Sequence, residues 1–217
     1  MKKIFLGGLL FAGLFFIAAK INLNQVKKAI IKIEDTTFKN GDLIFQTSES
    51  QQCEAVRIAT KSKFSHCGII FIEKGKTYVY EAVQPVKITP LKDWITHGKD
   101  SKYVVKRLKK LEEKLTESQI LVMKKYGEKQ LNKNYDIYFG WSDSEIYCSE
   151  LVWKIYKNGA NIEICPTKEL KDFDLSHPLV QSIMKQRYGS NIPYNEKVVA
   201  PSQLHDSELL ETIFDNY

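Results

Sequence analysis

The chain has 217 residues, of which 43% are hydrophobic and 27% are charged, and it carries 11 Tyr and 11 Phe. This length and supply of aromatic side chains predict a single folded domain and exclude a chain that is disordered throughout. The formal net charge is +6, and its densest basic run, residues 106–110, has no zinc-finger spacing or other nucleic-acid motif beside it. We therefore interpret the charge as a solvated surface and expect no nucleic-acid partner.

The N-terminus has the pattern of an export signal. A basic start precedes residues 4–19, which are uncharged and almost wholly apolar, and Ala19 is a suitable small residue before a cleavage site. The apolar run is slightly short for a membrane span, which favours a cleaved signal peptide over a retained anchor, but both alternatives stay open. We therefore divide the chain into a signal peptide or N-terminal membrane anchor (1–19), a lead-in segment (20–40) and one domain (41–217).

Either alternative places the domain outside the cytoplasm: periplasmic, secreted, or attached to a membrane through residues 4–19. Export leaves the four cysteines ambiguous, because an even number in an exported chain is compatible with two disulfides. A domain of this size does not need such cross-links, and the spacing matches neither a disulfide framework nor a CxxC metal pair. We expect Cys148 to be free and leave Cys53, Cys67 and Cys165 as free or paired.

The first half of the domain is predicted to be rich in strands. Gly41 and Asp42 indicate a turn before a short strand, and Ser48 or Ser50 is expected to cap a helix through residues 54–60. Two β-rich runs on either side of Gly75 predict an antiparallel hairpin. The elements expected up to residue 108 are strands at 43–45, 66–72, 77–83, 86–89 and 103–108, and helices at 54–60 and 90–95.

The second half is predicted to be mostly helical. Thr116 and Gln119 form a capping-box pattern that opens a helix running to about residue 131. Asp143 and Ser144 are candidate N-caps of a helix that begins close to Cys148. The remaining expectations are an aromatic loop at 134–140, a short helix at 167–173, a loop-like stretch at 185–200, a short helix from Pro201 and a closing strand at 209–214.

A cysteine in the first turn of a helix is a candidate nucleophile. Leu151, Val152, Ile155 and Tyr156 recur at helical spacing just after Cys148, so its thiol is expected near the unpaired N–H groups of the helix start. Those groups and the helix dipole favour the thiolate. The alternative is a small buried residue on a helix that faces the core.

A thiolate hydrolase also needs a base and a group that orients the base. His97, His177 and His205 lie in segments typical of surface loops, whereas His66 begins an apolar strand. His66 and Glu81 are about equally far from the hairpin turn, which predicts that they lie side by side, provided the strands do not slip by one residue. Successive side chains of a strand point to opposite faces of the sheet, so the Cys67 side chain should point away from His66 and serve in packing.

Four short motifs, which follow one another along the chain, carry a family resemblance. They are residues 41–45, residues 65–69, residues 80–82 and the run Tyr147-Cys148-Ser149-Glu150-Leu151-Val152. Together they resemble the permuted papain-like amidases of the YiiX type, relatives of the NlpC-type cell-wall cysteine peptidases, in which the histidine strand precedes the cysteine helix. The resemblance implies an α+β fold, in which an antiparallel sheet packs against helices that include the nucleophile helix.

The resemblance also implies the roles of individual residues. Cys148 would be the nucleophile, His66 the base, and Glu81 the residue that holds the imidazole in its useful tautomer. The backbone N–H of Cys148 would meet the oxyanion, and Tyr135 is the candidate for a second donor, with a core or rim aromatic as the alternative. No metal or organic cofactor is implied.

Three functional hypotheses follow. The first is an exported cysteine hydrolase that cleaves an amide, in a peptide or in the cell envelope, through a Cys-His-Glu triad and a thioacyl-enzyme intermediate. The second is a lipid-directed acyltransferase or thioesterase of the same permuted fold, although residues 185–217 are too polar for the additional hydrophobic span that this class favours. The third is a non-catalytic envelope-binding module, which predicts a broken triad.

Overall fold

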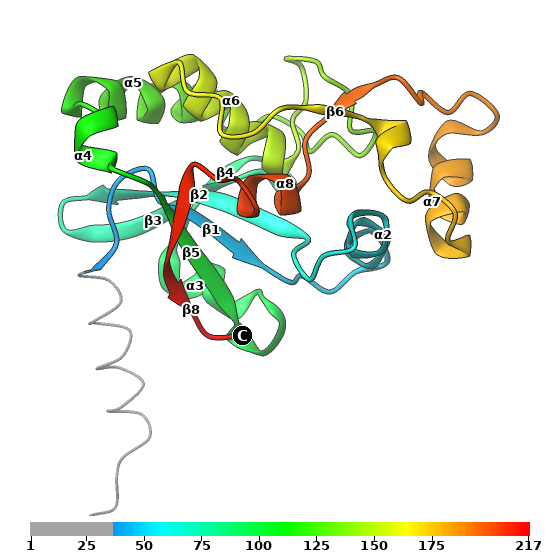
Figure 1. Cartoon of the computed structure of the whole chain (residues 1–217), viewed down its shortest axis with the longest axis horizontal. Coiled ribbons are helices and arrows are strands. Elements are labelled where there is room, and N and C mark those ends of the chain that lie inside the picture. The colour runs from blue at the N-terminus through cyan, green and yellow to red at the C-terminus, as the bar shows by residue number, and fades with distance from the viewer. Residues whose placement is uncertain (1–36) are drawn as a thin grey trace, which may run out of the picture.

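The computed structural model describes residues 37–217, and these residues fold around one antiparallel sheet (Figure 1). The strand order is β4-β3-β2-β1-β5-β8, with every neighbouring pair antiparallel. The strands are β1 (Leu43–Gln46), β2 (His66–Glu73), β3 (Lys76–Glu81), β4 (Lys87–Pro90), β5 (Tyr103–Leu108) and β8 (Leu210–Asp215).

Helices cover both faces of the sheet, because alternate residues of its strands are apolar on each side. Helices α5 (Glu117–Glu128) and α6 (Cys148–Ala160) lie over one face and α3 (Leu91–Thr96) over the other (Figure 1). The first face contributes Phe45, Ile69 and Phe71 to the main core with α6, while the second packs Ile44, Ile70 and Val79 against Trp94 of α3.

A smaller helical unit lies beyond one end of the sheet. Helix α2 (Gln51–Thr60) packs against α7 (Pro178–Tyr188), around Ala55, Val180 and Met184 (Figure 1). The remaining elements are α4 (Leu111–Lys114), α8 (Pro201–His205), the two-stranded pair β6 (Lys168–Glu169) and β7 (Lys197–Val198), and the short turns Lys99–Ser101 and Leu170–Asp172.

Most of the expected elements are confirmed. The hairpin β2–β3, the Ser50 N-cap of α2, the capping box of α5, and the later elements α3, β4, β5, α8 and β8 all form near the predicted residues. The four cysteines are all free thiols.

Three expectations are wrong. The N-cap of α6 is Tyr147, not Asp143 or Ser144, because the Glu150 carboxylate accepts the backbone N–H of Tyr147 and begins the helix there. Residues 167–173 form a two-residue strand and one turn of 3-10 helix, since Glu169 pairs with Lys197. Helix α7 extends into the stretch predicted to be loop-like and ends at Gly189, which has a positive φ.

The expectations for residues 1–19, and for most of the lead-in segment, lie outside the described residues. Within residues 37–217, no helix is long and apolar enough to cross a membrane.

Candidate active site

Helix α6 places Cys148 at its N-terminus. The apolar residues Leu151, Val152, Ile155 and Tyr156 are completely buried against the sheet, and this fixes the helix over the core. Cys148 is the first helical residue and is 4% exposed. Its sulfur therefore lies where unpaired backbone N–H groups and the helix dipole favour a negative charge.

His66 and Glu81 meet across the β2–β3 hairpin. His66 Nε2 lies 2.7 Å from Glu81 Oε2, and both side chains are buried. The Thr89 hydroxyl donates to the other carboxylate oxygen, Oε1, at 2.5 Å, and the indole of Trp94 stacks on the imidazole with ring centroids 5.8 Å apart. The imidazole is thus fixed both in its plane and in its orientation.

Cys148 and His66 come together where the first residue of α6 meets the first residue of β2. Because Nε2 of His66 is hydrogen-bonded to Glu81, Nδ1 is the ring nitrogen that can interact with the Cys148 thiol. Burial by itself lowers the pKa of His66, but its partners Cys148 and Glu81 outweigh that effect and raise the pKa to about 10. The thiolate–imidazolium ion pair is the state that this arrangement favours.

Cys67 lies beside the nucleophile candidate. It is fully buried in the core on the α6 side of β2, so its expected packing role is confirmed. Its side chain, followed by that of His66, lowers the pKa of the Cys148 thiol well below its ordinary value in spite of burial. Burial raises the pKa of the Cys67 thiol, with a further contribution from Cys148, so Cys67 stays protonated.

Tyr135 is also brought to the site. It forms an isolated β-bridge with Ile146, which places the aromatic loop against the start of α6. The Tyr135 hydroxyl accepts a hydrogen bond from Gln52 Nε2 at 3.2 Å and lies within the electrostatic reach of Cys148. Burial raises the pKa of this phenol, and the neighbouring Cys148 raises it further, so the hydroxyl remains a donor.

The other three histidines lie away from this group. His97 follows α3 and is exposed, His177 is exposed and caps α7, and His205 packs against Phe64 near the C-terminus. The structure therefore brings Cys148, His66, Glu81 and Tyr135 together and leaves His97, His177 and His205 outside.

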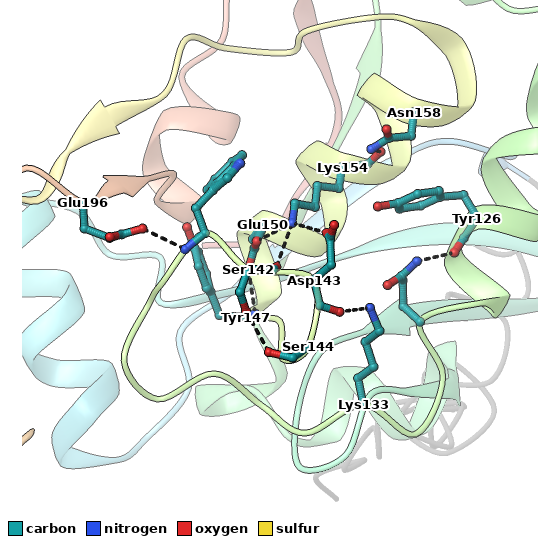
Figure 2. A network of polar contacts seen from close by, with 12 residues as sticks. Tyr126, Lys133, Ser142, Asp143, Ser144, Tyr147, Glu150, Lys154, Asn158 and Glu196 are labelled. Carbon is teal, nitrogen blue, oxygen red and sulfur yellow. Dashed lines mark hydrogen bonds and ion pairs between the residues drawn. The ribbon is translucent and has the colours of Figure 1, made fainter.

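A buried ion pair supports the start of α6 (Figure 2). Glu150, which is fully buried, pairs with Lys154 one turn later at 2.8 Å, and Lys154 Nζ also donates to Asp143 Oδ1 at 2.9 Å. The other oxygen of Glu150 accepts the N–H of Tyr147, the residue before Cys148. This network ties the loop before the helix to its first two turns and so fixes the position of Cys148.

Sequence reasoning did not find the walls of the pocket into which Cys148 opens. Gln52 and Arg187, separated by 135 residues, meet there through a hydrogen bond of 2.5 Å between Arg187 Nη2 and Gln52 Oε1. No local pattern predicts such a contact. The apolar spacing of Leu179, Val180 and Ile183 was a usable signal for α7, the helix that carries Arg187.

The comparisons with known proteins decide the family. Residues 37–214 match the family described as "Permuted papain-like amidase enzyme, YaeF/YiiX, C92 family". The chain belongs to this family. The uncharacterized protein YiiX of Escherichia coli strain K12 is 46% identical over 175 residues, which are 81% of this chain and 85% of that protein.

A solved structure agrees with this assignment. The crystal structure titled metalloprotein YiiX, from Escherichia coli O157:H7, is 45% identical, has a TM-score of 0.78, and covers 82% of this chain and 98% of that one. The fold is therefore the α+β permuted papain-like fold. Membership of this amidase family supports an activity of the cysteine-hydrolase type.

Proposed function

We propose that the chain is an exported cysteine amidase in which Cys148, His66 and Glu81 act as a catalytic triad. The observation that carries this proposal is one buried chain of contacts: the thiol at a helix N-terminus, the imidazole beside it, and the carboxylate 2.7 Å from the imidazole Nε2. A cysteine that is only a packing residue does not need a histidine held in this way.

The first half of the reaction forms the acyl-enzyme. The Cys148 thiolate attacks the amide carbonyl carbon, and the carbonyl π electrons move to the oxygen. In this proposal the backbone N–H of Cys148 and the Tyr135 hydroxyl donate to that oxyanion. The His66 imidazolium then gives its proton to the nitrogen, the C–N bond breaks, and the amine leaves behind a thioester.

The second half returns the free enzyme. His66, now neutral, takes a proton from water as the water oxygen attacks the thioester carbonyl. Collapse of the tetrahedral intermediate expels the Cys148 thiolate and releases the carboxylic acid. Glu81 keeps the imidazole in the correct tautomer and stabilises its charged form in both halves.

Metal ions have no assigned step in this mechanism. A related structure is titled a metalloprotein, but within residues 37–217 no group of three or more His, Cys, Asp or Glu side chains is arranged to hold a metal ion. The side chains of the described residues therefore do not offer a set of ligands that fits a metal ion.

The experiment that tests the proposal measures hydrolysis of fluorogenic N-acyl aminomethylcoumarin amides by the exported domain. Wild type is compared with Cys148→Ser and His66→Ala. Turnover that both substitutions abolish, together with a thioester adduct detected by mass spectrometry, supports the amidase. Binding of the amides without turnover in wild type would instead support a non-catalytic binding module.

A further inference from the structure

A second cavity lies where the end of α5 meets α6. Its volume is about 480 Å³, and its walls come from the end of α5 and the turn after it, the loop before α6, and the middle of α6. None of the described residues lines both this α5–α6 cavity and the pocket beside Cys148. The α5–α6 cavity is therefore separate from the proposed active site.

Two lysines fix one wall of the α5–α6 cavity. Lys154 Nζ donates to the backbone oxygen of Ser142 and to Asp143 Oδ1, each at 2.9 Å, and pairs with Glu150 Oε1 at 2.8 Å. Lys133 Nζ donates to the backbone oxygen of Asp143 (Figure 2). Because both lysines hold the same loop residue, this wall is ordered before a ligand arrives, which lowers the entropic cost of binding.

The lining carries positive charge that its own carboxylate does not compensate. Among the described residues that line the cavity, Asp143 is the only acid, and Lys154 already pairs with it. The ammonium group of Lys133 donates to a neutral carbonyl. Lys157 Nζ lies 3.5 Å from Glu163 Oε2, and both side chains are well exposed, so this pair is weak. Lys157 is thus the lining lysine that is most available to an anion.

Two indole rings give the same cavity a flat apolar surface. Trp141 and Trp153 both line it and are partly buried, with ring centroids 5.2 Å apart and planes at 72°. Trp153 Nε1 donates to the backbone oxygen of Cys165 at 2.8 Å, which fixes that ring. Aromatic rings beside ammonium and amide groups suit a ligand that has an apolar face and polar edges. A pyranose ring, with C–H groups on its face and hydroxyls around its edge, is such a ligand.

A buried amide offers an acceptor to a hydroxyl. Gln130 lines the cavity and is only 6% exposed. Its Nε2 donates to the backbone oxygen of Tyr126 at 3.1 Å, but its Oε1 accepts no hydrogen bond from residues 37–217. A buried acceptor without a donor costs free energy, so a hydroxyl that donates to Gln130 would bind favourably.

We propose that the α5–α6 cavity binds an acidic saccharide, a pyranose unit that carries a carboxylate or a phosphate group. The ring packs on the indoles of Trp141 and Trp153, a hydroxyl donates to Gln130, and the acid group pairs with Lys157. This site does not depend on the proposed amidase function, because it shares no side chain with the triad and requires no catalysis.

Isothermal titration calorimetry of the full chain tests the proposal. The probes are D-glucuronic acid and D-glucose 6-phosphate as acidic sugars, D-glucose as the neutral sugar, and acetate and inorganic phosphate as anions without a ring. We expect each acidic sugar to bind at least about tenfold more tightly than glucose and than the matching free anion, because only the acidic sugars use both the lysine and the indoles. The two acidic sugars together distinguish a carboxylate site from a phosphate site.

Two lysine substitutions locate the acid group. Lys157→Gln removes the charge but keeps a polar side chain, and it should weaken binding of the acidic sugars about tenfold while leaving the affinity for glucose unchanged. Lys92→Gln is the matched control: Lys92 is exposed on α3, on the other face of the sheet, and its loss changes the net charge equally. The control should bind every probe as wild type does.

The aromatic surface is tested at Trp141. Trp141→Ala should weaken binding of all three sugars about fivefold to tenfold, whereas Trp141→Phe keeps a ring and should retain most of the affinity. If Trp141→Ala does not fold, Trp141→Phe and Lys157→Gln still decide the matter.

Three results would overturn the saccharide site. The first is wild type that binds none of the sugars, or that binds glucose as tightly as the acidic sugars. The second is free acetate or phosphate that binds as tightly as the corresponding acidic sugar, which would leave an anion site only. The third is an affinity for the acidic sugars that Lys157→Gln leaves unchanged, which would place their binding elsewhere on the molecule.

Discussion

His66 and Glu81 meet diagonally across the β2–β3 hairpin, with Nε2 2.7 Å from Oε2. The register pairs Ile69 with Tyr80, so Glu81 lies across from Gly68 and His66 is two residues further along the same face. Gly68 is required at this point, because an added Cβ would lie 2.3 Å from Val79 Cγ1. The close packing of this hairpin therefore sets the distance between the imidazole and its carboxylate.

Replacing Glu81 tests the role of its charge. Glu81→Gln keeps a hydrogen-bonding side chain but removes the negative charge that helps to raise the pKa of His66 to about 10. We expect kcat/KM to fall by about 10–100-fold and its alkaline limb to move to lower pH, because His66 loses its proton earlier. A complete pH profile of amide hydrolysis measures both effects, and an unchanged alkaline limb would remove Glu81 from the triad.

Tyr135 is tested by the loss of a single oxygen. If its hydroxyl donates to the oxyanion, Tyr135→Phe should lower kcat by about 100-fold or more with little change in KM. Tyr138→Phe is the matched control, because Tyr138 lies in the same loop and is 48% exposed. Equal kcat values for the two variants would show that Tyr135 is only a wall of the pocket.

Glu150 predicts a dependence of stability on pH. Burial raises its pKa to about 7, although Lys154 opposes that effect. A carboxyl with a raised pKa contributes stability that is present below its unfolded pKa and is lost as pH rises toward the folded value. Wild type should therefore lose up to roughly 3 kcal/mol from this group between about pH 4.5 and 7, at about 1.4 kcal/mol per pKa unit.

The measurement is the free energy of unfolding in urea at pH 5 and at pH 8, for wild type and Glu150→Gln. The glutamine does not titrate, so the part of the pH dependence that comes from Glu150 should disappear. Parallel curves for the two proteins would contradict the assignment of this titration to Glu150.

The contact between α5 and α6 depends on Gly159. An added Cβ would lie 2.5 Å from the backbone Cα of Met123, which cannot move without separating the helices. Gly159→Ala should cost about 1–3 kcal/mol of unfolding free energy. Gly140→Ala, where the nearest atom is 3.4 Å away, should change it by less than about 0.5 kcal/mol. Thermal or urea unfolding of both variants measures this difference. Equal stabilities of the two variants would contradict the close approach of Gly159 to Met123.

Local patterns predicted the sheet well. The hairpin followed from β-rich runs around Gly75, and the start of α6 followed from apolar spacing after Cys148, because both are determined by residues close in sequence. The expectation that His66 and Glu81 would lie side by side depended on the register of the hairpin. The structure pairs Ile69 with Tyr80, which places Glu81 across from Gly68, so the pairing differs from the expected one by two residues. A shift of two keeps both side chains on one face, and they meet diagonally.

The features that the sequence did not predict depend on contacts between segments that are distant in the chain. The N-cap of α6 was placed too early because a buried glutamate, not a short polar side chain, begins the helix. Helix α7 was missed because Gly189 and Pro193 suggested a loop-like stretch at 185–200, whereas packing against α2 stabilises the helix. The pocket was not predictable, since its two walls come from segments more than 100 residues apart.

The ion pair between Cys148 and His66 is the central claim, and thiol alkylation tests it most directly. The rate of iodoacetamide reaction at Cys148 is measured from about pH 5 to 10 in wild type and in His66→Ala, with His97→Ala as the control histidine. Cys148 is identified as the site by peptide mass spectrometry.

The account predicts fast alkylation of wild type and His97→Ala below pH 7, because the pKa of Cys148 is lowered, and loss of that reactivity in His66→Ala. A wild-type Cys148 that titrates like an ordinary thiol near pH 8.5, with the same profile in all three proteins, would contradict it.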